Sequence, residues 1–214
     1  MTIIVHHLEN SRSQRVLWLL EELEIPYEVR RYERNKTTML APPELRRVHP
    51  LGKSPLIEDR DSDGEARVIA ETGAIIEYIV DKAGGRFGAP RAREEALHYR
   101  YYLHYAEGSL MPVLFVKLVL SRVPLLGRVA LKKFQPMVDV HVDYIESELG
   151  GRPWIAGESF TAADVMMSFP LEAARSRAGI SRDTHPHIFK WLDTIHARSA
   201  YQVALAKGGP YSYA

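Results

Sequence analysis

Residues 10–13, Asn-Ser-Arg-Ser, lie where a strand-like run gives way to an amphipathic helix. Residues 3–5 are rich in β-branched side chains, and residues 16–23 carry apolar side chains at the i, i+3, i+4 and i+7 spacing of one helix face. Ser11 and Gln14 match the capping-box pattern, in which a hydroxyl accepts a backbone N–H of the first turn. That hydroxyl can also donate to an anion outside the helix, whose N-terminus favours negative charge. Ser11 is therefore a candidate cap and a candidate anion ligand.

A second candidate site stands at Ser54-Pro55, where the chain enters a predicted strand. A trans proline is tolerated at a strand entrance. A cis proline would turn the chain sharply and expose the N–H and C=O of Ser54. Those groups would then pair with a peptide-like ligand as an added strand, and the residues alone leave both forms open.

Glu71-Thr72 forms a third candidate site, at a strand-to-helix junction. Thr72 is predicted to be the N-cap of the following helix. A carboxylate next to free helix N–H groups could also grip an amino-acid head group. Glu71 would then take the ammonium, and the helix N-terminus would take the carboxylate.

The three candidates lie on alternating strands and helices in the first part of the chain. The predicted order is β-α-β-α-β-β-α, over residues 2–5, 16–23, 26–32, 42–48, 54–58, 67–70 and 72–81. The Asp-Ser-Asp-Gly turn at 61–64 predicts an antiparallel hairpin. Later residues read as long helices, over 91–121, 124–149, 161–177 and 187–198. We therefore predict an α/β domain over 1–82, a glycine-rich linker over 83–90 and an all-α domain over 91–214.

Composition narrows the possible functions. The chain has 214 residues, 46% of them hydrophobic, which suffices for a substantial core, and its net charge of +1 gives no nucleic-acid footprint. It has no cysteine, which excludes disulfides, thiolate zinc sites and a catalytic cysteine. The histidine spacings predict no metal site. No apolar stretch approaches bilayer length and the N-terminus lacks a signal peptide, so we expect a cytoplasmic protein without a membrane partner.

The order and spacing of these motifs resemble cytosolic glutathione transferases along the whole chain. The matching segments are "HPLGKSPLIE" (49–58), "ETGAIIEYI" (71–79) and "FTAADVMMSFPL" (160–171), and their wording is similar to a fungal and bacterial serine-type subgroup. The resemblance implies a thioredoxin-like domain followed by an all-α domain. It also implies a capping box with Thr161 at the N-cap and Asp164 at N3.

The resemblance further implies which residues contact glutathione. Ser11 matches the serine that donates to the sulfur, and Arg12 is placed to reach the site from the helix end. Asn10 and Ser13 are close enough to compete with Ser11 for the sulfur. Which of the three hydrogen-bonding side chains contacts it stays open.

The remaining glutathione contacts follow from the other two motifs. Ser54 matches the residue whose backbone pairs with the cysteinyl part of glutathione, and Pro55 matches a cis-proline. Lys53 lies where a basic side chain meets the glycyl carboxylate. Glu71 and Thr72 match the pair that holds the γ-glutamyl end, with Thr72 replacing a more usual serine.

The sequence gives fewer indications of the residues that contact the second substrate. The helical part carries an aromatic stripe around Tyr105, which is typical of a core or a subunit interface and in this family also lines the second-substrate cleft. Tyr105, Ser109 and Val113 are the candidate lining residues.

The resemblance implies a homodimeric transferase that conjugates glutathione to small hydrophobic electrophiles, with hydroperoxide reduction as a related activity. A glutathione-dependent isomerase and a non-catalytic ligand-binding module are the alternatives.

Overall fold

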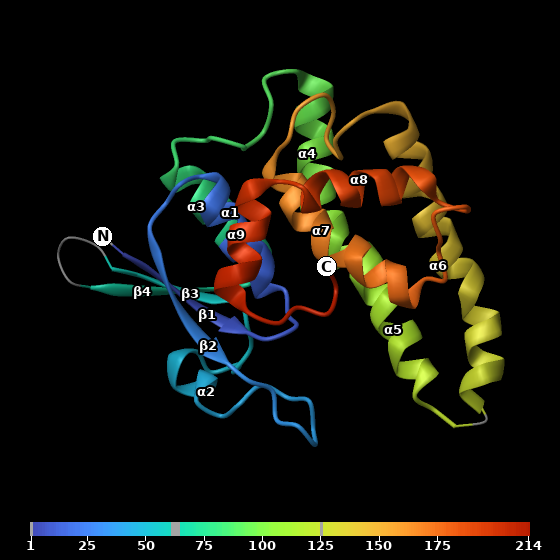
Figure 1. Cartoon of the computed structure of the whole chain (residues 1–214), viewed down its shortest axis with the longest axis horizontal. Helices are drawn as coiled ribbons and strands as arrows, with labels where there is room; N and C mark the ends of the chain where they lie inside the picture. Colours follow the sequence, from blue (N-terminus) through green and yellow to red (C-terminus); the bar gives the residue numbers. More distant parts are fainter. Residues whose placement is uncertain (1, 61–64, 125) are drawn as a thin grey trace. The chain divides into compact units, whose positions relative to one another are not determined.

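The computed structural model describes residues 2–60, 65–124 and 126–214. Contacts divide the chain into two compact units, Met1–Gly88 with His196–Ala214, and Ala89–Ile195. The first is an α/β unit and the second is helical, as predicted (Figure 1). The predicted domain boundaries remain predictions. The compact units differ from them because the last residues group with the α/β unit.

The elements of the α/β unit follow the predicted order. They are β1 (Ile3–Leu8), α1 (Ser13–Glu22), β2 (Tyr27–Tyr32), α2 (Leu45–Val48), β3 (Leu56–Arg60), β4 (Ala66–Ala70) and α3 (Thr72–Lys82), joined by α9 (Ser199–Gly208). Helix α9 was not predicted, because the sequence interpretation ended the last helix at residue 198.

The four strands form one mixed sheet in the order β2-β1-β3-β4. Strand β1 is parallel to β2 and antiparallel to β3. Strands β3 and β4 are antiparallel, with Leu56 opposite Ala70, which confirms the predicted hairpin. Its predicted turn, Asp61–Gly64, lies outside the described residues. The sheet register brings the ends of β1, β3 and β4 together, and the three motifs of the α/β unit follow or precede those ends.

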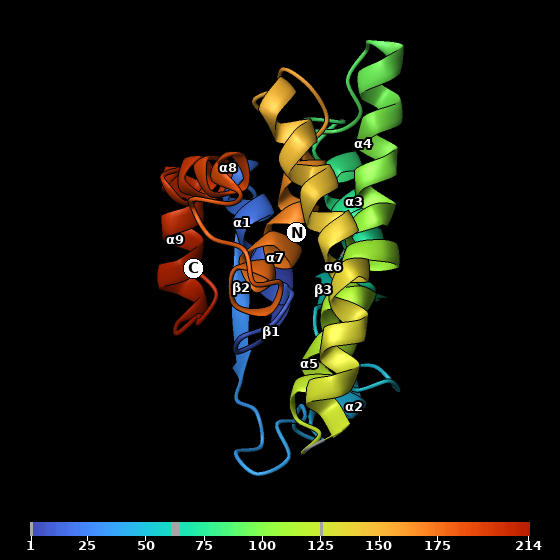
Figure 2. The same ribbon diagram turned by 90° about the vertical axis from the view of Figure 1, so that its right-hand side faces the viewer.

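Helix α1 is buried because it has neighbours on two sides. It contacts β1 and α3, and α9 packs along it (Figures 1 and 2). The Trp18 ring meets Tyr201 of α9 edge to face, with centroids 5.2 Å apart. Arg198 forms two hydrogen bonds to Glu22, at 2.5 and 2.8 Å. The C-terminal helix therefore completes the core of the first unit.

In the part of the chain that the structure describes, the helical unit contains one interrupted helix and three others. Its elements are α4 (Arg93–Tyr105), the π-helical turn η1 (Ala106–Leu110), α5 (Met111–Ser121), α6 (Leu126–Gly151), α7 (Ala162–Arg177) and α8 (Pro186–His196). The predicted helix 91–121 is thus divided by η1, which immediately precedes α5. Pro112 lies in the first turn of α5 and lacks the N–H that a regular helix would use there.

The path α4–η1–α5 corrects the expectation that no apolar stretch of the chain approaches the length that spans a bilayer. By length and composition alone, Arg93–Ser121 is long and apolar enough to cross a membrane. Core helices pass the same test, and Tyr102, Leu103 and Leu110 of this path are buried. The path therefore has one side in the core of the helical unit, and its exposed side is unusually apolar.

The start of α7 confirms the predicted capping box. The Thr161 hydroxyl accepts the Ala163 N–H, and an Asp164 carboxylate oxygen accepts the Thr161 N–H at 2.9 Å. The other carboxylate oxygen accepts the Ile155 N–H and the Trp191 indole N–H. Complete burial raises the pKa of Asp164 to about 6, while these donors favour the carboxylate. Asp164 therefore ties the loop before α7, the start of α7 and α8 together.

Replacing Asp164 tests this junction. Asp164→Ala leaves several buried donors without an acceptor, and we expect it to lower the free energy of unfolding by about 2–4 kcal/mol. Asp164→Asn keeps one acceptor oxygen and should cost less. Urea unfolding followed by circular dichroism measures both variants, and equal losses for Ala and Asn would contradict the assignment.

Candidate functional site

The loop between β1 and α1 places Ser11 just before the first turn of α1. The helix begins at Ser13, with Arg12 as its N-cap, and the Ser11 hydroxyl accepts the Ser13 N–H at 3.2 Å. The predicted Ser11–Gln14 capping box is wrong. The Gln14 side chain is buried against Gly208 of α9, where a Cβ on Gly208 would lie 2.6 Å from the Gln14 Oε1. Tertiary packing has therefore taken Gln14 away from the helix end.

A chain of side-chain hydrogen bonds runs inward from Ser11. The Ser11 and Ser13 hydroxyl oxygens lie 2.7 Å apart, and the Ser13 oxygen lies 2.9 Å from His7 Nδ1. The Gly208 backbone carbonyl accepts a hydrogen bond from the His7 ring. Three side chains of the loop region are thereby connected to the end of α9.

His7 sets the direction of this hydrogen-bonded chain. Burial, and secondarily the charge of Arg31, lower the pKa of His7 to about 4, so its ring is neutral at pH 7. A neutral ring has one N–H, which Gly208 takes, so Nδ1 must accept. Ser13 therefore donates to His7, and Ser11 donates its own proton to Ser13. The only proton of the Ser11 hydroxyl is thus donated to the Ser13 oxygen, which is a neutral acceptor. The Ser11 hydroxyl can rotate to donate this proton to a stronger, charged acceptor instead.

The other two candidates near Ser11 are held elsewhere. Ser13 is fully buried, and its oxygen also contacts the backbone N–H and C=O of Leu8. The Asn10 amide oxygen accepts the Ser212 N–H at 2.7 Å, and its backbone has a φ of 49°. Ser11 is the one hydroxyl of the loop whose proton is held by a single neutral acceptor.

The second motif adjoins this network at the start of β3. The Ser54–Pro55 peptide bond is cis. The Ser54 hydroxyl donates to the His6 carbonyl at 2.9 Å and accepts the Leu8 N–H at 3.3 Å. Leu8 N–H also points at the Ser13 oxygen at 3.3 Å. One backbone N–H at the end of β1 thus connects the Ser11 loop with Ser54.

The third motif reaches the same end of the sheet through the β3–β4 ladder. Ala70 pairs with Leu56, so Glu71 follows one strand directly where Pro55 precedes the other. The N-cap of α3 is Glu71, with a φ of 71°, and Thr72 is the first helical residue, which corrects the prediction that Thr72 is the cap. The left-handed backbone of Glu71 turns the chain sharply into α3. Its side chain is exposed while Thr72 is buried.

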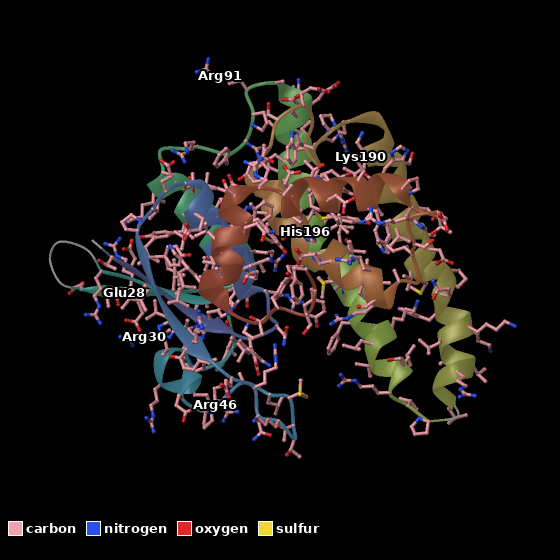
Figure 3. The ribbon with its side chains drawn as sticks, in the orientation of Figure 1. Glu28, Arg30, Arg46, Arg91, Lys190 and His196 are labelled. Carbon is pink, nitrogen blue, oxygen red and sulfur yellow. The ribbon has the colours of Figure 1, made fainter. Side chains whose placement is uncertain are left out.

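Two basic candidates border these motifs. Arg12 is half-buried at the N-cap of α1, and Lys53 is exposed immediately before Ser54. Gly52, beside Lys53, has a φ of 56° and lies under the Arg46 side chain, which Figure 3 labels. A Cβ at this position would come within 2.6 Å of Arg46, so glycine is needed both for the turn and for the close approach.

Sequence reasoning missed the residues that support the loop. His7 was treated only as a potential metal ligand, and Gly208 was not considered. Arg34 was also missed. Its guanidinium donates to the backbone carbonyls of Glu9, Asn10 and Met39, which fixes the loop from the side of β2. A histidine at the end of a strand, directly before a serine-rich loop, was the available indication for His7.

In the helical unit, two of the three candidate lining residues meet at one pocket. Tyr105 and Ser109 border a pocket of about 710 Å³, and Val113 is not among its lining residues. Its other lining residues are Leu97, His98, Arg100, Tyr101, His104, Gly108 and Tyr144. The Tyr105 hydroxyl lies 2.6 Å from His141 Nδ1, and burial raises the pKa of Tyr105. The phenol is therefore neutral, and its hydroxyl is hydrogen-bonded to His141.

The candidate metal ligands are dispersed in the ranges that the structure describes. No cluster of three or more histidine, aspartate or glutamate side chains is arranged there to hold an ion.

Comparison with known proteins matches both parts of the chain to the same family. Residues 11–82 match the glutathione S-transferase N-terminal domain, and residues 128–199 match the C-terminal domain. Glutathione S-transferase 3 of Schizosaccharomyces pombe is 35% identical, over 96% of this chain and 87% of that protein. A glutathione S-transferase structure from Actinobacillus pleuropneumoniae superposes with a TM-score of 0.86 at 32% identity, covering 99% and 95% of the two chains.

More distant relatives have other described activities or ligands. The disulfide-bond oxidoreductase YfcG of Escherichia coli is 28% identical over 96% of this chain and 95% of its own. A transferase-family structure from Pseudomonas fluorescens, described with two glutathione bound, is 25% identical with a TM-score of 0.78, covering 95% and 92% of the two chains. Sequence similarity along most of the chain thus extends to a protein that is described by a different activity.

The buried His7 predicts a pH dependence of stability. The folded protein holds the His7 pKa near 4, whereas the unfolded value is 6.5. Between these pH values the unfolded chain binds more protons, so stability is present above pH 6.5 and is lost as the pH falls toward 4. At pH 4.5 we expect His7 to contribute a loss of about 2–3 kcal/mol.

Urea unfolding of the wild type and of His7→Phe, at pH 7 and pH 4.5, measures the contribution of His7 to the free energy of unfolding. Phenylalanine fills the ring volume but cannot titrate, so its stability should decline less on acidification. Parallel pH profiles for the two proteins would show that His7 is not the responsible group.

Proposed function

Because the chain belongs to the glutathione S-transferase family, we propose that it conjugates the glutathione thiolate to small hydrophobic electrophiles. One observation carries the proposal. The Ser11 hydroxyl stands at the N-terminus of α1, connected through Leu8 to Ser54 at the cis peptide bond. A hydroxyl that can donate a hydrogen bond to a thiolate therefore lies at the same end of the sheet as a backbone that can pair with a cysteinyl residue.

The proposed mechanism is stabilisation of an anion by a neutral serine. A free thiol has a pKa of about 8.5 and is mostly protonated at pH 7. Ser11 would leave its neutral hydrogen bond to Ser13 for a charge-assisted bond to the sulfur, which is the stronger of the two. The N-terminus of α1 acts in the same direction. Each unit by which the thiol pKa falls corresponds to about 1.36 kcal/mol in favour of the thiolate.

The rest of glutathione would be held by the surrounding motifs. The Ser54 backbone would pair with the cysteinyl residue, and Glu71 with the γ-glutamyl ammonium. The buried Thr72 begins α3, whose N-terminus would receive the γ-glutamyl carboxylate. Lys53 and Arg12 would meet the glycyl carboxylate from two sides. Glutathione is then a co-substrate, and no step requires a metal.

The electrophile would lie against the aromatic surface of the helical unit. Tyr105 and Ser109 are supported by the pocket that they share, and Val113 stays a proposed lining residue on its sequence position alone. The same thiolate would attack a hydroperoxide, which would release the alcohol and leave a glutathione sulfenic acid. A second glutathione would condense with the sulfenic acid to give glutathione disulfide and water. We place this detoxifying activity in the cytoplasm.

We further propose that the enzyme is a homodimer. An exposed apolar surface on α4 and α6, here called the upper face, supports this. It comprises Leu97, Tyr101, Met137, Val140 and Tyr144. Surfaces of this kind are typical of subunit interfaces.

Light scattering tests the dimer. We expect about twice the 24.3 kDa mass of one chain. The double variant Tyr101→Ser/Val140→Ser should raise the dissociation constant by more than about tenfold, because it removes apolar contact area. A monomeric wild-type protein would refute the proposal.

Substitution of Ser11 tests the mechanism. Ser11→Ala should lower turnover about 10- to 100-fold, since a hydrogen bond to a charged group contributes about 1.5–3 kcal/mol. Glutathione affinity should change less than about threefold, because the other contacts remain. Conjugation of an aryl halide measures turnover, and absorbance of the bound thiolate as a function of pH measures the thiol pKa.

Asn10→Ala and Ser13→Ala are the matched controls, and both should retain most of the turnover. An active Ser11→Ala together with an inactive Ser13→Ala or Asn10→Ala would reassign the sulfur contact. A wild-type protein that is not retained on a glutathione column, and that turns over neither an aryl halide nor a hydroperoxide, would defeat the transferase proposal.

A further inference from the structure

The hairpin formed by α5 and α6 has an unusual charge composition. Residues 109–138 contain five basic residues and no acidic residue. Lys117 points inward, where its ammonium donates to Gln135 and to the Ala178 carbonyl. The other four are exposed around the connection between the helices. They are Arg122, Arg128, Lys132 and Lys133.

The same end of the hairpin exposes large apolar side chains, here called the hairpin tip. They are Phe115, Val116, Val119, Val123, Leu126 and Val129. Leu126 is 77% exposed and Val129 is 60% exposed, which is unusual for aliphatic side chains in a packed helical unit. Phe115, Val116 and Val119 lie on one side of α5 by their helical spacing. Val123 follows the end of α5, and Leu126 and Val129 lie in the first turn of α6. The exposed apolar side chains are thus concentrated where α5 ends and α6 begins.

The hairpin tip stands apart from the other helices of its unit. In both ribbon views the end of α5 and the start of α6 lie at the end of the unit away from α8 and from the start of α4 (Figures 1 and 2). The exposed apolar side chains are thus presented at a projecting end.

Charge decides which kind of partner fits this surface. A second copy of the chain meeting the tip would bring two sets of four basic side chains together, without an acidic residue in the segment to offset them. Like charges in contact are unfavourable, and they are costliest where water is excluded. The upper face lacks this concentration of charge, so self-association is favoured there and opposed at the tip.

We propose that the hairpin tip docks on an anionic lipid surface. Its apolar side chains would enter the boundary between headgroups and acyl chains, while the surrounding arginine and lysine side chains would reach the lipid phosphates and carboxylates. Long basic side chains suit this position, because their aliphatic stems lie along apolar surface while their charges stay in the headgroup layer. The proposal replaces the sequence-based expectation of no membrane partner. It holds whether or not the chain is a transferase.

Vesicle co-sedimentation tests the docking. We expect the wild-type protein to bind phosphatidylcholine vesicles that contain phosphatidylserine, to bind pure phosphatidylcholine much more weakly, and to be released by high salt. Arg122→Gln/Lys132→Gln should lower the partition coefficient about 30-fold, at about 1 kcal/mol per basic residue. Val119→Asn/Leu126→Asn should lower it at least as much.

Matched controls use exposed residues of the same kind elsewhere. Arg91→Gln/Lys190→Gln removes two charges from the same unit, at positions that Figure 3 shows away from the hairpin connection. Val68→Asn/Val203→Asn removes two exposed apolar side chains from the α/β unit. Both controls should bind vesicles as the wild type does. Equal losses in the tip and control variants would overturn the proposal.

A fluorescent label locates the contact directly, because the chain has no cysteine. An environment-sensitive dye on Leu126→Cys should shift to the blue with anionic vesicles, whereas the same dye on Lys190→Cys should not. No vesicle binding by the wild type would overturn the proposal. So would tip variants that change the mass seen by light scattering and leave vesicle binding intact, because the tip would then be a protein interface.

Discussion

The packing of α9 against α1 is the contact on which the site depends. It buries α1 on a second side through Trp18 and Tyr201, and the Arg198–Glu22 pair fixes the angle between the helices. It also brings Gly208 to His7 and Gln14. Without α9, the His7 ring would lose the carbonyl that fixes its tautomer, and Gln14 would be free to return to the end of its own helix.

The contact between α9 and α1 determines which hydroxyls donate and which accept in the chain of hydrogen bonds from His7 to Ser11. A neutral histidine with one N–H engaged can only accept at its other nitrogen. Ser13 must therefore donate inward, and Ser11 is left with a proton on a neutral acceptor. A neutral hydrogen bond contributes about 1 kcal/mol, whereas a bond to an anion contributes about 1.5–3 kcal/mol. Under the proposed function, an incoming thiolate would thus outcompete Ser13 for the hydrogen bond that the Ser11 hydroxyl donates.

The helical unit carries two exposed apolar surfaces that differ in charge. The upper face is aromatic and aliphatic, and it borders the pocket of Tyr105 and Ser109. The hairpin tip is mostly aliphatic and is surrounded by arginine and lysine. Because apolar burial drives both kinds of association, the charge pattern distinguishes a protein interface from a lipid surface. An enzyme that acts on apolar electrophiles would meet them at higher concentration at a membrane.

The sequence by itself determined most of the elements. The alternation of strands and helices and the β3–β4 hairpin were predictable, because each depends on periodicity or on residues a few positions apart. The Thr161–Asp164 capping box was expected from the family resemblance. Only the tertiary structure decided the direction of the Ser11 hydroxyl, the left-handed Glu71 cap and the place of α9. These depend on contacts such as His7 with Gly208, which are about 200 residues apart, and local sequence preferences do not encode which distant groups will compete for one hydrogen bond.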